Sequence, residues 1–295
     1  MVAGVVMKYL FRVLIVAVLC GPFADAADGA AAKPRLTVVS FNIRCPKDKA
    51  PNDWAHRKER VIRDLRRMKP DIFGLQEATP KQIAALQVLG YRHIGHGRNR
   101  DLKGEATPVF YDPRRFEVVE ERTVWLSRTP RVYSLAEGAD MPRVVTLGVF
   151  REKKSGREFV FASTHLHHKN QKVCHMEQIR AVLDALAPYI RRGMTVFLTG
   201  DFNSSPAGIA PRETAKVLRD AYLVSETKPV QPEPCTFHGF APVVSISASR
   251  KRKPRIDFIW VTPDVRVLRY ESVNNFDEKK LASSDHYPQL AEVEF

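Results

Sequence analysis

Apolar and polar residues follow two repeating patterns along this chain. Short apolar runs bounded by turn residues predict strands over residues 35–41, 71–75, 108–111, 116–126, 144–150, 159–166, 195–198, 256–261, 265–270 and 290–295. Apolar residues at helical spacing predict helices over 54–68, 176–190 and 213–218. Thr79-Pro80 predicts the start of another helix, which Gly90 ends. Asp112-Pro113 indicates a hairpin turn.

Strands alternate with helices at both ends of the chain, and hairpins are expected between them. This order favours an α/β fold in which mixed sheets are covered by helices. The sequence shows no convincing linker and no internal repeat. We therefore expect one domain over residues 27–295.

The first 26 residues have the pattern of a secretory signal. Lys8 and Arg12 form a positive flank before a short apolar stretch over residues 14–19, and Ala24-Asp25-Ala26 offers small residues for cleavage. No later segment is apolar enough for a membrane helix. We expect cleavage near Ala26 and an exported, periplasmic or secreted monomer without a stable membrane span.

Positive charge favours an acidic partner. The formal net charge is +14, of which residues 1–26 contribute +1. Nucleic acid and anionic lipid both suit such a balance. Two basic features stand out: the run Arg250-Lys251-Arg252-Lys253, and one face of the first helix, which carries Arg57, Lys58, Arg60, Arg63, Arg66 and Arg67. Both also fit ordinary solvent-exposed surface.

Three cysteines follow the signal segment, namely Cys45, Cys174 and Cys235. An odd number in an oxidising compartment leaves at least one thiol unpaired or paired outside the chain. Their pairing stays open. Their spacing does not match a zinc site.

Polar side chains follow several of the apolar runs. Burying them there costs folding free energy, so a chemical role is a natural reason for their presence. Asn42 and Glu77 each end a predicted strand, and their oxygens suit a hard cation such as Mg²⁺, although both also fit helix or turn caps. Asp201 and Asn203 lie on one face of an extended segment. Asp285-His286 adds a carboxylate and an imidazole, and Asp257 lies within another apolar run.

Histidines cluster after the 159–166 run. His165 fits a phosphate-stabilising group, whereas His167 and His168 also fit ordinary surface histidines. Zinc would need further ligands at short spacing, and Cys174 and His175 are expected on the following helix.

Six stretches of the chain resemble the endonuclease/exonuclease/phosphatase superfamily, in its order and over nearly all of residues 27–295. They are Ser40-Phe41-Asn42-Ile43-Arg44, Gly74-Leu75-Gln76-Glu77, Ser163-Thr164-His165-Leu166, Gly200-Asp201-Phe202-Asn203, Arg255-Ile256-Asp257-Phe258-Ile259 and Ser284-Asp285-His286-Tyr287-Pro288. The resemblance implies a four-layer α/β/β/α sandwich with two mixed β-sheets packed face to face. It also implies a divalent ion, Mg²⁺ or Mn²⁺.

The same resemblance implies roles for individual residues. Asn42, Glu77 and Asp285 match the metal neighbourhood, and Asp201 and Asn203 match the pair that orients water and phosphate. His286 matches a general base oriented by Asp257, and Asp201 is the alternative base. His165 matches a phosphate-stabilising group, held by Glu105.

Further stretches resemble a small bacterial-type subgroup whose substrate is unsettled. They are residues 104–111, 125–127 and 235–240. His167 stands where related sequences carry an acidic residue, and Cys174-His175 stands where they carry an arginine. Both departures put substrate choice in doubt more than chemistry.

We therefore expect a metal-dependent phosphoester hydrolase in which water attacks phosphorus in line. A nuclease-like phosphodiesterase is the first hypothesis, in which Arg252 of the basic run reaches phosphates. A phosphatase or phospholipase-C-type hydrolase of a small sugar, inositol or lipid phosphate is the second, with a narrow pocket lined by His167 and His238. A non-catalytic binding module on the same fold is the third.

Overall fold

Two six-stranded mixed sheets form the centre of the protein. The computed structural model describes residues 1, 33–169, 171–230, 235–241 and 255–295. In order across the first sheet, the strands are β11 (Arg266–Ser272), β12 (Gln289–Glu294), β1 (Arg35–Asn42), β2 (Ile72–Gln76), β4 (Val109–Tyr111) and β3 (Arg92–Ile94). Across the second sheet, they are β5 (Phe116–Trp125), β6 (Val144–Glu152), β7 (Glu158–His165), β8 (Thr195–Asp201), β10 (Asp257–Val261) and β9 (Arg219–Asp220).

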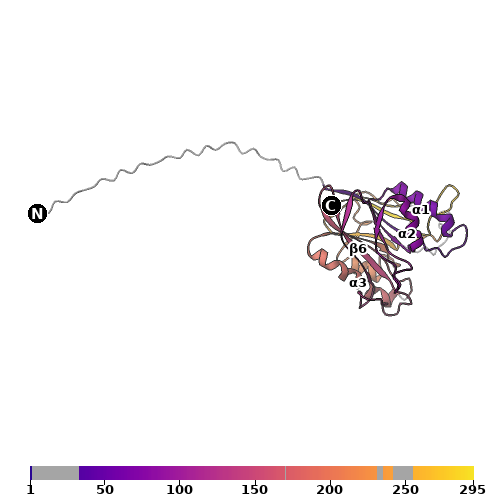
Figure 1. Ribbon diagram of the computed structural model, residues 1–295, viewed down its shortest axis with the longest axis horizontal. Helices are drawn as coiled ribbons and strands as arrows, with labels where there is room; N and C mark the ends of the chain where they lie inside the picture. Colours follow the sequence, from indigo (N-terminus) through magenta and orange to yellow (C-terminus); the bar gives the residue numbers. More distant parts are fainter. Residues whose placement is uncertain (2–32, 170, 231–234, 242–254) are drawn as a thin grey trace, which may run out of the picture. The chain divides into compact units, whose positions relative to one another are not determined.

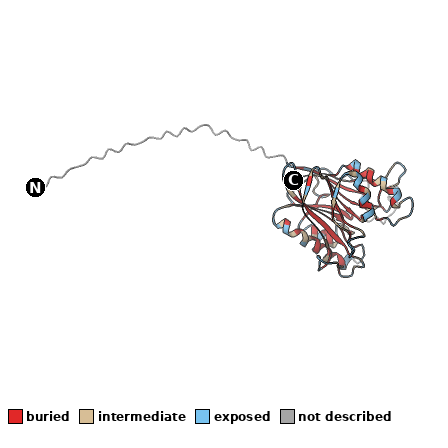
Figure 2. Cartoon of the chain, viewed as in Figure 1, coloured by how far each residue is buried: buried red, intermediate tan, exposed pale blue. Residues whose placement is uncertain are grey.

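Helices cover the outer faces of both sheets. Helices α1 (Trp54–Met68) and α2 (Pro80–Leu86) lie on one side of the strands and α3 (Gln171–Arg191) on the other, as Figure 1 shows. A short helix, α4 (Ile209–Thr214), and a 3₁₀ turn, η1 (Gln87–Leu89), complete the helical elements of the described residues. The central strands are buried, β5 is partly exposed, and the outer helix faces are exposed (Figure 2). The expected four-layer sandwich is confirmed.

Strand alternation produces three apolar layers from these elements. Val38 and Phe161 belong to the core between the sheets. Val39 belongs to the core under α1, and Val160 packs in the core under α3. Because successive side chains point to opposite faces, every second residue of a central strand enters the same layer. Polar residues that continue this alternation at a strand end therefore stay on the face between the sheets.

The two sheets approach closely near their polar ends. A Cβ added at Gly74 would lie 2.2 Å from Oγ1 of Thr199 and 2.7 Å from Oγ of Ser163. No side chain fits there, which accounts for glycine in the middle of a buried strand. Gln76 donates to Oγ of Ser163 across the same gap, at 3.2 Å. This polar layer joins the sheets just below the site.

Most predicted elements are confirmed, with α1 at the expected bounds. The hairpin at Asp112-Pro113 is wrong, because β4 belongs to the first sheet and β5 to the second, so this turn carries the chain between sheets. The predicted 213–218 helix is also wrong, since α4 runs from Ile209 to Thr214 with Pro211 in its first turn. Strands β3 and β9 were not predicted, because strands of three and two residues are too short to show an alternating pattern.

The structure bears on only part of the sequence-based expectations about export. Within the described ranges, no helix has the length and apolar character needed to cross a membrane. The predicted signal segment, apart from Met1, lies outside the described residues, as does Arg252 with the basic run around it.

Candidate active site

Three site residues are lateral neighbours at the ends of adjoining strands of the second sheet. His165 of β7 pairs in register with Asp201 of β8, and Asp201 pairs with Asp257 of β10. All three are almost fully buried. Their positions continue the alternation of residues that face the first sheet, so the strand pattern itself directs these polar groups between the sheets.

The first sheet contributes Asn42 and Glu77 to the same place. Asn42 ends β1, and its Nδ2 donates to Oε1 of Glu77 at 3.2 Å and to Oδ2 of Asp201 at 3.0 Å. The backbone N–H of Cys45 donates to the other oxygen of Glu77, Oε2, at 2.9 Å. Glu77 has a φ of 59°, in the left-handed region that a non-glycine residue adopts at a cost.

Charge around Glu77 keeps it ionised. Burial opposes the charged form, but the neighbouring imidazoles and the hydrogen bonds from Cys45 outweigh it and lower the pKa of Glu77. The site thus holds a permanently ionised carboxylate at its floor.

His286 and Asp257 form the expected imidazole–carboxylate pair. Nδ1 of His286 lies 2.9 Å from Oδ2 of Asp257, and Nε2 lies 3.8 Å from Oδ2 of Asp201. Burial lowers the pKa of His286, but the charge of Asp257 and its hydrogen bond outweigh burial and raise the pKa to about 10. Burial and the charge of Asp257 also raise the pKa of Asp201.

Asn203 connects Asp201 with His165. Its backbone N–H donates to Oδ1 of Asp201 at 2.8 Å, and its φ is 48°. Nδ2 of Asn203 lies 2.9 Å from Nε2 of His165 and donates to the carbonyl of Leu166 at 3.1 Å. A second residue in left-handed backbone conformation thus lies at the site.

Glu105 does not hold His165 directly, contrary to the sequence-based expectation. Nδ1 of His165 lies 2.9 Å from Nη1 of Arg143 instead. Glu105 lies 3.9 Å from that Nη1 and pairs with Arg98 at 2.9 Å. Sequence reasoning missed Arg143, because a single arginine before a predicted strand carries no chemical pattern.

These side chains line a cleft of about 210 Å³. Its lining residues are Arg44, Lys47, Glu77, Arg98, Glu105, Met141, Arg143, His165, His168, Asp201, Asn203, Phe237, Ile256 and His286. Carboxylates form one part of this lining, and cations form much of the rest. Such a distribution suits a metal ion together with an anionic substrate group.

Five of the described residues that were predicted for the site are not part of the cleft lining. Two of them, Asn42 and Asp257, contact the lining residues Asp201 and His286 directly. Asp285 is buried, and its carboxylate lies 3.4 Å from Nη1 of Arg44. His238 is buried against Phe276 and Tyr287. His167 is also buried, which corrects its interpretation as a surface histidine, and its Nε2 lies 3.3 Å from Asp140. The prediction that His167 and His238 line the pocket is therefore wrong. Their neighbours His168 and Phe237 line it instead.

The arginines of α1 do not form a free basic face. Arg57, fully buried, donates to four backbone carbonyls, those of Ile43, Arg44, Asn52 and Ser283. Arg60 donates to the carbonyls of Ala282 and Pro51, Arg63 to that of Asn275 and Arg67 to that of Asn274. Four of the six basic residues thus fasten α1 to neighbouring loops.

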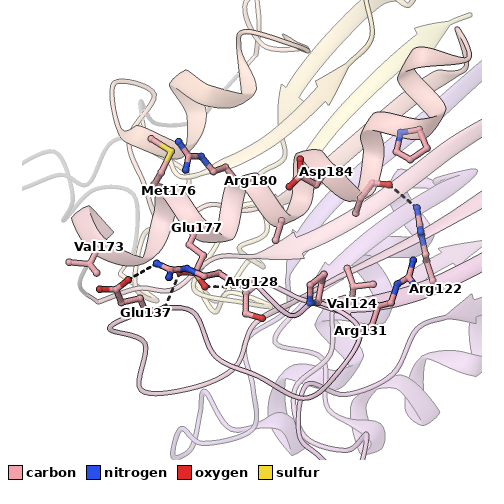
Figure 3. Close-up of a pocket in the computed structure, with 15 residues that line it drawn as sticks. Arg122, Val124, Arg128, Arg131, Glu137, Val173, Met176, Glu177, Arg180 and Asp184 are labelled. Atoms are coloured by element: carbon pink, nitrogen blue, oxygen red, sulfur yellow. Dashed lines mark hydrogen bonds and ion pairs between the residues drawn. The ribbon is translucent and has the colours of Figure 1, made fainter.

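A larger hollow of about 710 Å³ lies elsewhere, between α3 and the 122–137 segment. Figure 3 shows Arg128 in this hollow between Glu137 and Glu177, which it contacts at 2.8 and 3.3 Å. None of the strand-end polar residues lines it. Its size does not make it the reaction site, because the polar groups at the strand ends lie elsewhere.

The donor set of the cleft fits a hard divalent cation. Glu77 and Asp201 bring two carboxylates to one amide, that of Asn42, and Asp257 is close behind. Asp201, Asp257 and His286 also place one potential ligand atom each within 4.8 Å of the others. A cation can balance buried like charges of this kind, and oxygen donors suit a hard divalent ion.

The chain belongs to the endonuclease/exonuclease/phosphatase family, whose model matches residues 39–286. A family member from Bacteroides vulgatus is 32% identical, with a TM-score of 0.78 over 89% of this chain and 100% of that one. A mannosyl-6-phosphatase from Bacteroides thetaiotaomicron is 29% identical, with a TM-score of 0.79 over 88% of this chain and 100% of that one.

More distant relatives share only part of their length with this chain. The protein named angel of Drosophila melanogaster is 26% identical over 163 residues, which are 52% of this chain and 44% of that protein. The chain thus spans less than half the length of the curated relatives that it matches. The family relationship supports a phosphoester hydrolase.

Proposed function

We propose that this protein is a divalent-metal-dependent phosphatase that acts on a compact phosphate ester, such as a sugar phosphate. The observation that carries the proposal is the small cleft, about 210 Å³, in which carboxylates face cations. A phosphoryl group with a small alcohol fits such a volume. The neighbour of matched length that is named a mannosyl-6-phosphatase supports the same substrate class.

A long nucleic acid is less well supported. Such a ligand requires a row of free cations that follow its phosphates. Arg57, Arg60 and Arg67 of α1 instead donate to protein carbonyls. The nuclease hypothesis therefore loses one of its two basic surfaces, and the other lies outside the described residues.

Glu77, with Asn42 beside it and Asp285 in the adjoining loop, would hold the metal. A cation bound there would supply Lewis-acid chemistry, polarising a phosphoryl oxygen and offsetting negative charge on the leaving oxygen. Asp201 supplies the base that accepts a proton from the attacking water. His286, oriented by Asp257, donates toward the phosphoryl group.

The surroundings support Asp201 over His286 as the base. The carboxylates around His286 raise its pKa to about 10, so the ring is protonated at neutral pH. Burial and Asp257 raise the pKa of Asp201, which makes its carboxylate a better proton acceptor. A carboxylate with a raised pKa can act as the base while the charged imidazole beside it acts as the hydrogen-bond donor, both at pH 7.

A substrate screen tests the proposal. Purified protein with Mg²⁺ or Mn²⁺ is assayed for release of phosphate from mannose 6-phosphate, other hexose phosphates and inositol phosphates, and for cleavage of DNA, RNA and bis-(p-nitrophenyl) phosphate. We expect hydrolysis of a sugar phosphate at the highest kcat/KM. Faster cleavage of nucleic acid would restore the nuclease hypothesis, and inactivity on every ester with either metal would favour a binding module.

We also propose that the protein is exported after cleavage near Ala26. The charged flank and short apolar stretch of residues 1–26 support it. N-terminal sequencing of the protein from an exporting host tests this, and retention of Met1 on the mature protein would contradict it.

A further inference from the structure

Arg143 places a buried positive charge against a site histidine. Only 5% of the residue is exposed, and Nη1 lies 2.9 Å from Nδ1 of His165. Its Nε has no hydrogen-bond partner among the described residues. The nearest carboxylate is that of Glu105, 3.9 Å from Nη1. The shortest contact of this internal cation is therefore an imidazole ring and not an acid.

The direction of this hydrogen bond follows from the two groups. A guanidinium has only donors, so Nδ1 of His165 must accept. A neutral imidazole with Nδ1 as acceptor carries its proton on Nε2. Nε2–H of His165 then faces the cleft.

A second donor converges on the same point. Nδ2 of Asn203 lies 2.9 Å from Nε2 of His165, and its bond to the carbonyl of Leu166 identifies this atom as the amide nitrogen. Two N–H groups cannot satisfy each other. Oδ2 of Asp201 lies 3.4 Å from Nε2 of His165 and already accepts a hydrogen bond from Nδ2 of Asn42. A further acceptor oxygen within hydrogen-bonding distance of both N–H groups would accept from them together.

We propose that Arg143 is a positioning residue that holds His165 as an Nε2–H donor, so that His165 and Asn203 donate together to one phosphoryl oxygen. This inference rests on the proposed function. In this arrangement Glu105 acts on His165 only through Arg143, since its carboxylate pairs with Arg98 and lies 3.9 Å from Nη1 of Arg143. His165 thereby stabilises charge on the phosphoryl oxygen and keeps its proton throughout the reaction.

Kinetics of two variants test the positioning role. Removing a group that orients a metal-binding histidine typically lowers activity about 10–100-fold, and we use this range as a guide for His165. We expect Arg143→Ala to lower kcat by that factor with a smaller change in KM, and Arg143→Lys to recover little, because an ammonium lacks the planar fork of the guanidinium. Millimolar guanidinium should partly restore Arg143→Ala, whereas sodium chloride at equal ionic strength should not.

Arg151→Ala is the matched control. Arg151 lies toward the other end of β6, where it pairs with Glu117 and Glu158 at the surface. We expect wild-type kcat and no response to guanidinium. An unchanged kcat in Arg143→Ala, or full activity in Arg143→Lys, would overturn the positioning role.

Nitrogen NMR of the full-length protein gives a readout that does not depend on activity. With ¹⁵N-labelled histidine, the His165 signals are those lost in His165→Gln. We expect an unprotonated Nδ1 and a protonated Nε2 at pH 7. A proton on Nδ1 in the wild-type protein would overturn the inference even if Arg143→Ala fails to fold. Inactivity on all esters with the expected tautomer present would refute the proposed function instead.

Discussion

Asn42 of the first sheet donates a hydrogen bond of 3.0 Å to Asp201 of the second sheet, 159 positions later in the chain. The same amide holds Glu77, so one side chain fixes both carboxylates of the cleft floor. We predict that Asn42→Ala destabilises the protein by about 1–3 kcal/mol, because it leaves buried acceptors without a donor. Urea denaturation measures this. A stability equal to that of the wild type would show that the amide is not a structural bridge.

Asp201→Asn should lower kcat more than His286→Gln. Asparagine keeps the size of the side chain but cannot accept a proton, and the loss of a general base costs about 10²–10⁴-fold. Glutamine at position 286 retains an N–H donor and so part of the proposed role of His286. Initial rates at saturating metal compare the two variants. A larger loss of kcat in His286→Gln than in Asp201→Asn would indicate that His286 is the general base.

Arg57 should be the most important α1 arginine for stability. Its guanidinium donates to four carbonyls in the loops that follow Asn42 and precede Asp285. We predict that Arg57→Met costs about 2–4 kcal/mol, because these buried carbonyls lose a charged donor. Urea unfolding measures it. Arg66→Ala, at an exposed position of the same helix, should change stability by less than about 0.5 kcal/mol.

Hydrolysis should depend weakly on salt. A protein that neutralises 6–10 nucleic-acid phosphates loses roughly 10³–10⁵-fold in affinity between about 50 and 200 mM salt. A compact ester in the small cleft meets only a few cations, so we expect kcat/KM to fall less than about tenfold over this range. Steady-state rates in sodium chloride check this, and a steeper fall would indicate an extended polyanion as substrate.

The thiol of Cys45 should be unreactive in the folded protein. Burial and then the charge of Glu77 raise its pKa to about 12, so thiolate, the reactive form, is scarce at pH 8. Intact-mass analysis after iodoacetamide treatment should show modification of Cys45 in urea but not in buffer. Cys45→Ser identifies the peptide concerned. Alkylation in buffer at the rate of a small thiol would contradict the raised pKa.

Much of the site could be predicted from the sequence because its residues end apolar runs. Asp201, Asp257 and His165 lie at the ends of strands whose alternation is visible in the chain, and the sheet register brings these strand ends together. Their individual roles stay predictions until variants are measured. The covering helix α1 was equally visible from its spacing.

Other features depend on tertiary contacts that carry no local pattern. Arg143 acquires its place beside His165 only when the segment before β6 packs against the end of β7. The α1 arginines look like solvent-exposed charges, and only the folded loops show that their partners are backbone carbonyls. Asp112-Pro113 has the composition of a hairpin turn, yet sheet assignment is decided by pairing partners far away in sequence.

The cleft floor is divided between two sheets, since Asn42 belongs to one and Asp201 to the other. The proposed site draws Asn42 and Glu77 from one half and Asp201 and Asp257 from the other. Turnover therefore requires that the two sheets be packed together. Any loosening of the interface between them should abolish activity before secondary structure is lost. Enzymatic rate would thus serve as a sensor of correct assembly of this protein.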